Sequence, residues 1–425
     1  LPDAPADEVT AVSSSARSWL LLGALFGALA IVAVVWIHAD RRPPEWDHAN
    51  HLERAAVCGK ILGDRGVAGW AEIVEMSSFY PPVVACSAGL LSLVFPLTPL
   101  TAQSVILAFL ALALASLFLL GRRLFDSSTG VLAALIFGAA PFVVFSTTNF
   151  QLDLPLAAAV IFALLLLVLT DDFSRRGWSA AAGLAFAFGM LVKPPFAVYL
   201  FPPLALVAWR SLRGPDRRAR VVNLGMALLL GGALSLPWYG PRLFGLPLQI
   251  AARSFKQAAL QGSPETLTGA ALLLYPRTLP AIFGFLAAPL FAWGLLALAR
   301  RRDSRGLLWS ASLVPFAVFL LIQNKNYRYV LPLLPVAALI AAAGFRALAP
   351  VWRRGLAVAL VGVSALQVSA AAFAAPPLSR WTAFNAPLVF SFPPSPAEWP
   401  HAQILDLIVR EAGGRRATVS VVPNY

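Results

Sequence analysis

Long stretches without a charged side chain are the feature that most limits how this chain can fold. Eleven of them occur in the sequence, at 18–37, 76–121, 127–152, 154–170, 177–192, 194–209, 221–241, 278–299, 306–324, 329–345 and 355–379. An apolar, uncharged run of about 20 residues is long enough to cross a bilayer as a helix. Only 12% of the residues are charged, about half of the share in a typical soluble protein. The sequence therefore predicts an all-α polytopic membrane protein.

Charge decides how often the longest run, 76–121, crosses the membrane. Cytoplasmic loops carry an excess of Lys and Arg. If this run crosses once, through 101–121, five basic clusters with 16 Lys and Arg residues fall on the cytoplasmic side, and the other connections hold 7. We therefore expect about 11 transmembrane helices, the N-terminus inside and the C-terminus outside, with 78–97 re-entrant or lying in the interface. The basic clusters are Arg122/Arg123, Arg175/Arg176, 210–220, 300–305 and Arg346/Arg353/Arg354.

This topology divides the chain into three predicted regions. Residues 1–17 form a cytoplasmic tail, and 18–375 form the transmembrane domain, whose large outer loops are 38–100 and 240–277. Residues 376–425 begin a non-cytoplasmic C-terminal region, and its last letters, "ATVSVVPNY", resemble a strand cut short. The net charge of +13 is then an orientation signal rather than a sign of nucleic-acid binding.

Sparse polar residues from distant parts of the chain fall on the predicted outer face. Ionisable residues at or near membrane depth are functional candidates. Their gathering on one face predicts an active site at the boundary between lipid and water. The candidates are Glu45, Asp47, His48, His51, Asp153, Lys193, Lys325, Arg328 and Tyr329.

The two acids, Asp47 and Asp153, each have two interpretations. Either can be the N-cap of the helix that follows it, and Pro155 suits the first turn after Asp153. Asp47 can instead be a general base, which needs a carboxylate held near a hydroxyl or amine. On residue type alone we favour the cap, although the two roles are compatible.

His48 and His51 lie near Asp47 at helical spacing, which is a weak metal signal. We expect exposed loop histidines and assign no metal ligand, although a divalent cation stays open. Cys58 and Cys86 form no metal or redox motif. A disulfide between them is possible in an oxidising outer space, but we expect them to be unpaired.

The basic candidates Lys193, Lys325 and Arg328 are either snorkelling side chains that mark the interface or cations for a phosphate, and both interpretations remain open. The amphipathic stretch "PLQIAARSFKQAAL" carries Arg253 and Lys256. It can lie on the membrane surface or cover a substrate.

An ordered set of segments resembles the GT-C type integral-membrane glycosyltransferases, in particular the dolichyl-phosphate-mannose–protein mannosyltransferase and bacterial aminoarabinose transferase group. The resemblance covers roughly residues 18–375. After the acidic first loop, its segments are "FYPPVVACSAGLLSLVFP", "LLGRRLFDSSTGVLAALIFGAAP", "LDLPL", "WSAAAGLAFAFGMLVKPP" and "NKNYRYVLPLLPVAALIA".

The resemblance assigns expected roles to individual residues. Asp47 takes the position of the family's catalytic acid, whereas the second acid of the usual Asp-Glu pair is replaced by His48, so that Glu45 or Glu53 would have to substitute. Asp153 matches the acid of the second outer loop. Lys193 matches a lysine next to a Gly-Pro step that is Pro194–Pro195 here. Arg328 and Tyr329 match an Arg-Tyr pair before an apolar helix.

The resemblance implies a polyprenyl-phosphate-linked sugar as donor, bound from the bilayer, and a lipid, protein or cell-envelope glycan as acceptor on the non-cytoplasmic face of a bacterial inner membrane. A lipid phosphate leaves without a general acid, so one carboxylate base suffices for an inverting attack. The absence of a Gly-rich phosphate loop argues against a nucleotide-sugar donor.

The alternatives are a flippase or transporter of polyprenyl-linked glycans, or a polymerase or ligase. A transporter predicts mid-span charges and an inverted repeat, and neither is visible in the sequence.

Overall fold

The computed structural model describes residues 6–299 and 305–415, and most of them are helical. The predicted basic cluster 300–305, apart from Arg305, and the strand-like stretch "ATVSVVPNY" lie outside the described residues. The long bundle helices are α1 (Ala6–Ala39), α5 (Pro99–Leu124), α6 (Ser127–Gly138), α7 (Pro141–Ser146), α8 (Asp153–Leu169), α9 (Arg176–Val192), α10 (Phe196–Arg213), α11 (Arg217–Tyr239), α14 (Gly269–Phe283), α15 (Ala287–Ala299), α16 (Arg305–Leu321), α17 (Leu334–Arg346) and α18 (Pro350–Phe373).

Smaller elements connect and cover this bundle. The first outer loop holds α2 (Trp46–Arg65), α3 (Trp70–Glu75) and α4 (Val83–Leu91), and the second holds α12 (Gly245–Ala251), the π-helical Ala252–Lys256 and α13 (Gln257–Leu260). The described C-terminal part holds the antiparallel pair β1 (Thr382–Ala383) and β2 (Ala386–Pro387) and the helix α19 (His401–Ala412). Single 3₁₀ turns lie at Gly66–Gly69, Gly240–Arg242, Tyr327–Tyr329, Leu331–Leu333 and Leu378–Arg380.

Several of these helices suit a membrane. Within the described residues, five helical stretches are long and apolar enough to cross one: Ala16–Ala39, Pro99–Leu124, Arg217–Arg242, Tyr327–Arg346 and Pro350–Phe373. The pair α14 and α15, bent by 117° at its junction, makes a sixth if it is one span. Four of the other predicted runs contain shorter apolar helices, at Ser127–Gly138, Asp153–Leu169, Arg176–Val192 and Gly306–Leu321, and the expected number of about 11 crossings stays a prediction.

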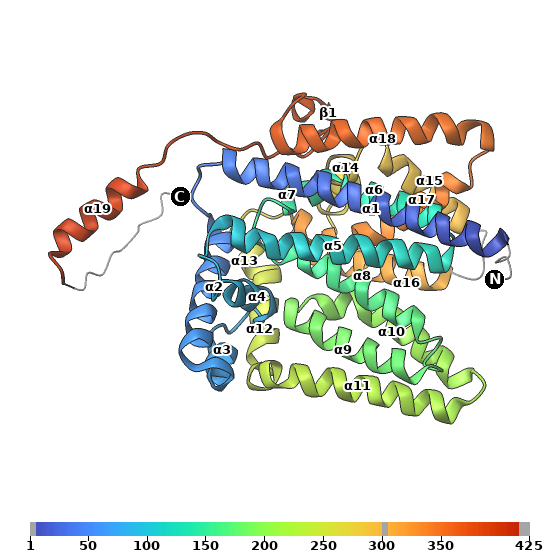
Figure 1. Cartoon of the computed structure of the whole chain (residues 1–425), viewed down its shortest axis with the longest axis horizontal. Helices are drawn as coiled ribbons and strands as arrows, with labels where there is room; N and C mark the ends of the chain where they lie inside the picture. Colours follow the sequence, from blue (N-terminus) through green and yellow to red (C-terminus); the bar gives the residue numbers. More distant parts are fainter. Residues whose placement is uncertain (1–5, 300–304, 416–425) are drawn as a thin grey trace, which may run out of the picture.

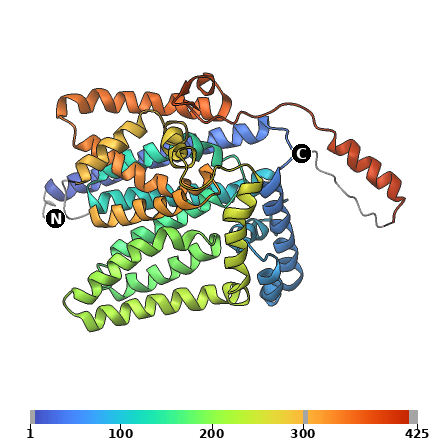
Figure 2. The same ribbon diagram turned by 180° about the vertical axis from the view of Figure 1, so that it is seen from behind.

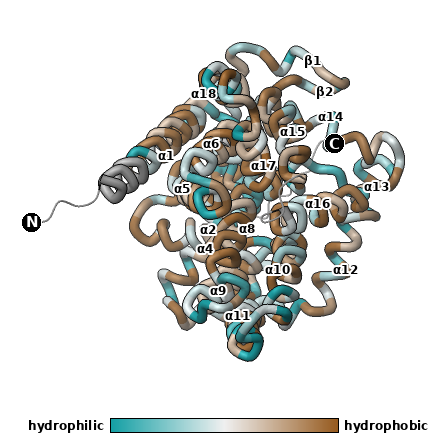
Figure 3. The backbone as a smooth tube through the Cα atoms, turned by 90° about the vertical axis from the view of Figure 1, so that its right-hand side faces the viewer, coloured by the Kyte–Doolittle hydropathy of each residue, from teal (hydrophilic) through white to brown (hydrophobic). Residues whose placement is uncertain are grey.

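The outside of the bundle is apolar, as helices that face lipid require. Large apolar side chains such as Leu20, Ile31, Leu229 and Val361 are exposed by 74%, 66%, 72% and 57%. Figure 3 shows apolar residues, in brown, on helices at the periphery as well as in the middle of the bundle. A water-soluble bundle would show the opposite pattern, with polar residues outside.

The two outer loops gather at one end of the bundle, which positions the site. Figure 1 shows α2, α3, α12 and α13 at the end where α1 finishes, standing across the direction of the long helices. Figure 2 shows the same end of the bundle from behind. Segments about 200 positions apart in the sequence are therefore brought together at the predicted outer face.

The segment 78–97 contains only the helix α4, whose nine residues extend over about 14 Å, far less than the bilayer's hydrocarbon core. It packs on α2 through two glycines: a Cβ on Gly89 would lie 2.7 Å from the backbone nitrogen of Gly59. A disulfide joins Cys58 of α2 to Cys86 of α4. The expectation of unpaired cysteines is wrong, because this close helix packing brings the two side chains together.

The central helix is α8, and it carries one of the candidate acids. Its side chains are buried on nearly every side, because α5, α9 and α10 pack around it. A helix that is apolar all round belongs in the interior. Asp153, the first residue of α8, is therefore held in the middle of the bundle at its outer end.

Candidate active site

Four charged residues from four segments meet at the end of the bundle where α2 begins. Asp47 is in the first turn of α2, Asp153 begins α8, Lys193 directly follows α9, and Arg328 is in the turn Tyr327–Tyr329. Arg328 Nη1 lies 2.6 Å from Asp47 Oδ2, and its Nε lies 4.0 Å from Asp153 Oδ2. Lys193 Nζ lies 2.6 Å from Asp153 Oδ1. One guanidinium thus stands between the two acids.

The side chain of Asp47 points to this cluster rather than to its own helix. The N-cap of α2 is Glu45, which makes no side-chain cap bond, and Asp47 accepts from Arg328 and, at 3.3 Å, from the hydroxyl of Tyr80. The expectation that Asp47 caps α2 is therefore wrong. Burial alone would raise the pKa of Asp47, but the hydrogen bond and the charge of Arg328 lower it below its ordinary value. Asp47 is thus a carboxylate at neutral pH.

Asp153 is also not a cap. The N-cap of α8 is Leu152, and the side chain of Asp153, 4% exposed, faces Lys193 and Arg328. A buried carboxylate needs such partners, because desolvating an unpaired charge is costly. Asp153 therefore holds two cations at the site. Its Oδ2 accepts no hydrogen bond from the described residues.

A cavity of about 410 Å³ opens beside this cluster. Arg253, from the π-helical turn of the second outer loop, lies over the ring of Phe79 with its Cζ 3.8 Å from the ring centroid. The stretch 247–260 thus covers the cavity. The lining residues are Trp46, Asp47, Phe79, Tyr80, Gln151, Lys193, Pro194, Pro195, Val198, Ile250, Arg253, Ser254, Gln257, Gln261, Phe319, Ile322, Asn324, Arg328 and Tyr329.

Tyr329 and Lys325, two candidate residues from the segment "NKNYRY", differ in their position relative to the cavity. Tyr329 lines the cavity, and its ring stacks on Phe319 at a centroid distance of 5.5 Å. Lys325 does not line it: its Nζ donates to the carbonyl oxygens of Phe319 and Leu320, at 3.1 and 2.7 Å. Lys325 therefore satisfies the free carbonyls at the end of α16, a role that basic side chains often have.

The two histidines are not exposed loop residues, contrary to expectation. His51 is 3% exposed and packs edge-on against Tyr80, and the buried His48 Nε2 has no hydrogen-bond partner among the described residues. Burial lowers the pKa of His51 to about 3 and that of His48 to about 4, so both are neutral at pH 7. The reason is the packing of α2 onto the bundle, which the sequence of α2 does not reveal.

No group of three or more His, Cys, Asp and Glu side chains is arranged to hold a metal in the part of the chain that the structure describes. Glu45 also lies apart from the charged cluster, in a neighbouring cavity with His48. It does not take the place of a second acid beside Asp47. A divalent cation at the site stays an open prediction.

Sequence reasoning missed two residues of the site, Tyr80 and Gln151. Tyr80 donates to Asp47, and burial, with Asp47 nearby, raises the pKa of the Tyr80 hydroxyl, so it keeps its proton. Gln151 lines the cavity two positions before Asp153. The "FYPP" segment before α4 was a usable signal for Tyr80, whereas a lone uncharged Gln gives none.

Two family models match separate parts of this chain. The model described as dolichyl-phosphate-mannose-protein mannosyltransferase matches residues 80–238. The model described as the Alg9-like mannosyltransferase family matches residues 267–380. No curated protein matches the whole sequence at a significant level.

Solved structures share the fold. ArnT from Cupriavidus metallidurans in the apo state superposes with a TM-score of 0.61 and 17% identity, over 88% of this chain and 67% of that chain. The same protein bound to undecaprenyl phosphate gives 0.61 and 16%, over 86% and 66%. This chain thus spans about two thirds of the length of ArnT. In these two sequence segments and in its fold, the chain is thus similar to the GT-C type integral-membrane glycosyltransferases.

Proposed function

We propose that this protein is an inverting glycosyltransferase that moves a sugar from a polyprenyl-phosphate donor to an acceptor on the non-cytoplasmic face of a bacterial inner membrane. The observation that carries the proposal is the cavity in which one carboxylate, Asp47, stands beside the three cations Lys193, Arg253 and Arg328. A carboxylate next to a cationic cradle suits a reaction that deprotonates an acceptor and releases a phosphate.

Each side chain has a defined task in this reaction. Asp47 accepts the proton of the acceptor hydroxyl or amine, which attacks the anomeric carbon of the sugar from the face opposite the phosphate. The bond between that carbon and the phosphate oxygen breaks, and its electron pair stays on the phosphate. Lys193, Arg253 and Arg328 bind the phosphate before and after the step, as positioned cations do.

Asp153 serves as a positioning residue in this proposal. It bonds Lys193 directly and faces Arg328, so it keeps two cations aimed at one point. Arg328 also contacts Asp47, which ties the base to the phosphate cradle. Tyr80 orients the second oxygen of Asp47.

The choice of donor rests on the surroundings of the cavity beside Asp47. It lies at the end of an apolar bundle, among helices that can hold a long lipid tail, and ArnT, which shares the fold, has been crystallised with undecaprenyl phosphate. The charge split between the two faces supports an N-terminus in the cytoplasm. The sugar in this proposal is a hexose or a pentose.

The binding test uses the purified protein in nanodiscs with undecaprenyl phosphate as the probe. Arg253→Gln should weaken binding about tenfold, the effect of one charge-assisted hydrogen bond. Lys256→Gln is the matched control, because Lys256 is on the same turn but does not line the cavity. Equal losses in the two variants would reject the cradle.

The reaction test compares membrane glycolipids with and without the protein by mass spectrometry. A transferase produces free polyprenyl phosphate and a sugar-modified acceptor. A flippase moves the intact donor, so an unchanged sugar–phosphate bond during turnover would favour the transporter instead.

A further inference from the structure

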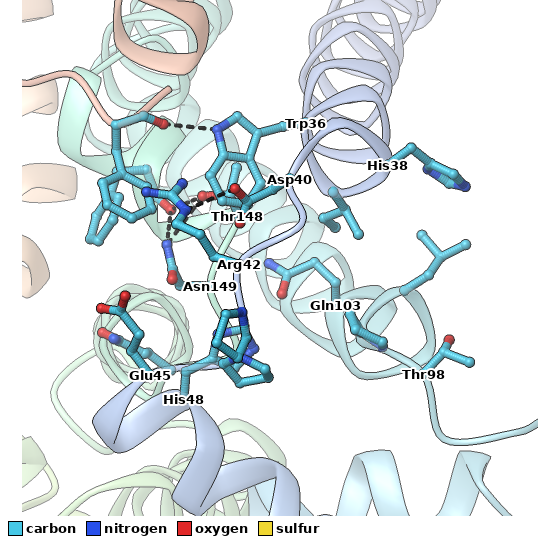
Figure 4. Close-up of a pocket in the computed structure, with 18 of the residues that line it drawn as sticks. Trp36, His38, Asp40, Arg42, Glu45, His48, Thr98, Gln103, Thr148 and Asn149 are labelled. Atoms are coloured by element: carbon cyan, nitrogen blue, oxygen red, sulfur yellow. Dashed lines mark hydrogen bonds and ion pairs between the residues drawn. The ribbon is translucent and has the colours of Figure 1, made fainter. Parts of the chain in front are cut away.

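A second cavity, of about 530 Å³, lies on the other side of Trp46 and Gln151. These two residues line both cavities. The walls of the second cavity come from the end of α1, the linker into α2, the start of α5, the turn after α7 and Phe392 of the C-terminal segment. Figure 4 shows side chains of these elements around the cavity, with His38 pointing away from it.

The lining is rich in uncharged hydrogen-bonding groups and aromatic rings. Gln103 Nε2 donates to the carbonyl oxygen of Thr147, and Asn149 Nδ2 donates to the hydroxyl of Thr148 and to a backbone carbonyl. The side-chain oxygens of Gln103 and Asn149 and the amide of Gln151 are the groups of this lining that can bond ligand hydroxyls. Trp36, Trp46, Phe145 and Phe392 supply flat apolar faces. Such a mixture of apolar faces and a few directed polar groups is typical of small-molecule sites.

The guanidinium group of this lining is paired. Arg42 bonds Asp40 at 2.8 Å and the carbonyl oxygen of Pro393 at 2.9 Å, and it lies 4.1 Å over the ring of Phe392. Of the described residues that line the cavity, Arg42 is the one guanidinium or ammonium group. Burial lowers the pKa of His48 to about 4, so it is neutral. The cavity therefore offers no free cation for a phosphate, unlike the cavity beside Asp47.

We propose that this second cavity binds the acceptor, and that the acceptor presents an uncharged, hydroxyl-rich glycan there rather than a phosphate group. The assignment rests on the proposed glycosyl transfer. His48 also lines this cavity, and its buried Nε2, which lacks a partner among the described residues, would bond one ligand hydroxyl as donor or acceptor according to the tautomer. Glu45 is an acceptor for another.

The two cavities meet where the reaction would occur. Trp46 directly precedes Asp47, and Gln151 is two positions before Asp153. An acceptor in the second cavity therefore needs to extend only past these two residues to enter the cavity that holds the carboxylate of Asp47.

The experiment measures binding of three soluble probes to the full chain in lauryldimethylamine oxide, a detergent without sugar. The probes are the neutral mannotriose and maltotriose and the anionic mannose 6-phosphate. Leu100→Trp fills the cavity at a residue that is 39% exposed. Leu93→Trp is its control, since Leu93 is similarly exposed, at 49%, and does not line the cavity. Asn149→Leu removes an amide from the wall.

We expect at least one neutral trisaccharide to bind, and Leu100→Trp and Asn149→Leu each to weaken it about tenfold, with Leu93→Trp unchanged. Thermal unfolding checks that each variant is folded, and Leu100→Trp keeps the test valid if Asn149→Leu is unstable. Preference for mannose 6-phosphate, failure of both trisaccharides to bind, or equal affinity in Leu100→Trp would overturn the assignment.

Undecaprenyl phosphate binding, measured on the same samples, separates the two proposals. Its affinity should be unchanged in Leu100→Trp and Asn149→Leu. Failure of the wild-type protein to bind either trisaccharide, with lipid-phosphate binding retained, would reject the acceptor cavity alone. Failure of the wild-type protein to bind the lipid phosphate, with glycan binding retained, would reject the donor proposal instead.

Discussion

At the scale of single residues, Asp47 shows how a side chain near a helix start can serve the tertiary structure instead of the helix. Its two oxygens contact Arg328 and Tyr80, and α2 begins without a side-chain cap. Substitution at Asp47 should therefore affect the chemistry far more than the helix. Because its side chain is 29% exposed, loss of its charge is also tolerable for folding.

We predict that Asp47→Asn folds normally and loses sugar transfer by roughly 10²–10⁴-fold, the contribution of a general base. The measurement is the initial rate of transfer alongside thermal unfolding. Asp64→Asn is the control, since Asp64 is an exposed acid of the same helix that lines neither cavity. If His48→Ala abolished transfer while Asp47→Asn stayed active, the base would have to be sought at the histidine.

We also predict that thermal stability falls as the pH drops below about 6.5, the ordinary pKa of histidine. The folded-state pKa values of His51 and His48 are about 3 and about 4, so between these values and 6.5 the unfolded state binds more protons, and acid favours unfolding. His51→Phe, which keeps a ring against Tyr80, should flatten the dependence between pH 7 and 5. An unchanged slope in this variant would contradict a buried, neutral His51.

At the scale of elements, α2 and α4 form one unit that carries part of the site. The glycine contact Gly59–Gly89 and the disulfide Cys58–Cys86 hold them together. Asp47 lies at the start of α2, and Tyr80 precedes α4. The distance between the side chains of Asp47 and Tyr80 therefore depends on how firmly α2 and α4 are held together.

Removal of the disulfide in a Cys58→Ala/Cys86→Ala variant should destabilise the protein by about 3–4 kcal/mol, the entropy estimate for a sequence separation of 28. Reductant should lower the unfolding temperature of the wild type and leave that of the double variant unchanged. Equal responses of the two proteins to reductant would show that the bond does not stabilise the unit.

At the scale of the whole molecule, the outer loops and the site gather at one end of the bundle (Figure 1). The turn between α10 and α11 lies at the other end, and it carries part of the basic cluster 210–220. The distribution of charge along the sequence thus matches a separation in space. This separation underlies the predicted orientation.

We predict that a cysteine at Arg213 and one at Leu260 are labelled from opposite sides of sealed membranes. Both native cysteines are in the disulfide, so the added thiol is the reactive one, and Leu260 is 82% exposed. An impermeant maleimide applied from outside should label Leu260→Cys and spare Arg213→Cys until the membrane is opened. Labelling of both from the same side would refute the topology.

Several features of this protein could be predicted from the sequence because they depend on local, additive properties. Hydropathy summed over about 20 residues predicts helices that can cross a membrane. The number of Lys and Arg residues in each loop predicts which loops lie on the same side of the membrane. These two properties were enough to bring Asp47, Asp153, Lys193 and Arg328 to one face, although their catalytic and binding roles stay proposals.

The contacts themselves depended on tertiary structure, because they join residues that no local pattern relates. Arg328 reaches Asp47 across 281 positions, and Lys193 reaches Asp153 across 40. The packing of α2 against the bundle buried His51 and paired Cys58 with Cys86, where composition favoured exposed histidines and free thiols. Lys325 donates hydrogen bonds to carbonyl oxygens at the end of α16 and does not line the cavity beside Asp47. Gln151, an uncharged residue, is assigned to the site only because it lines both cavities. The shape of a cavity depends on how the helices pack and cannot be read from the sequence alone.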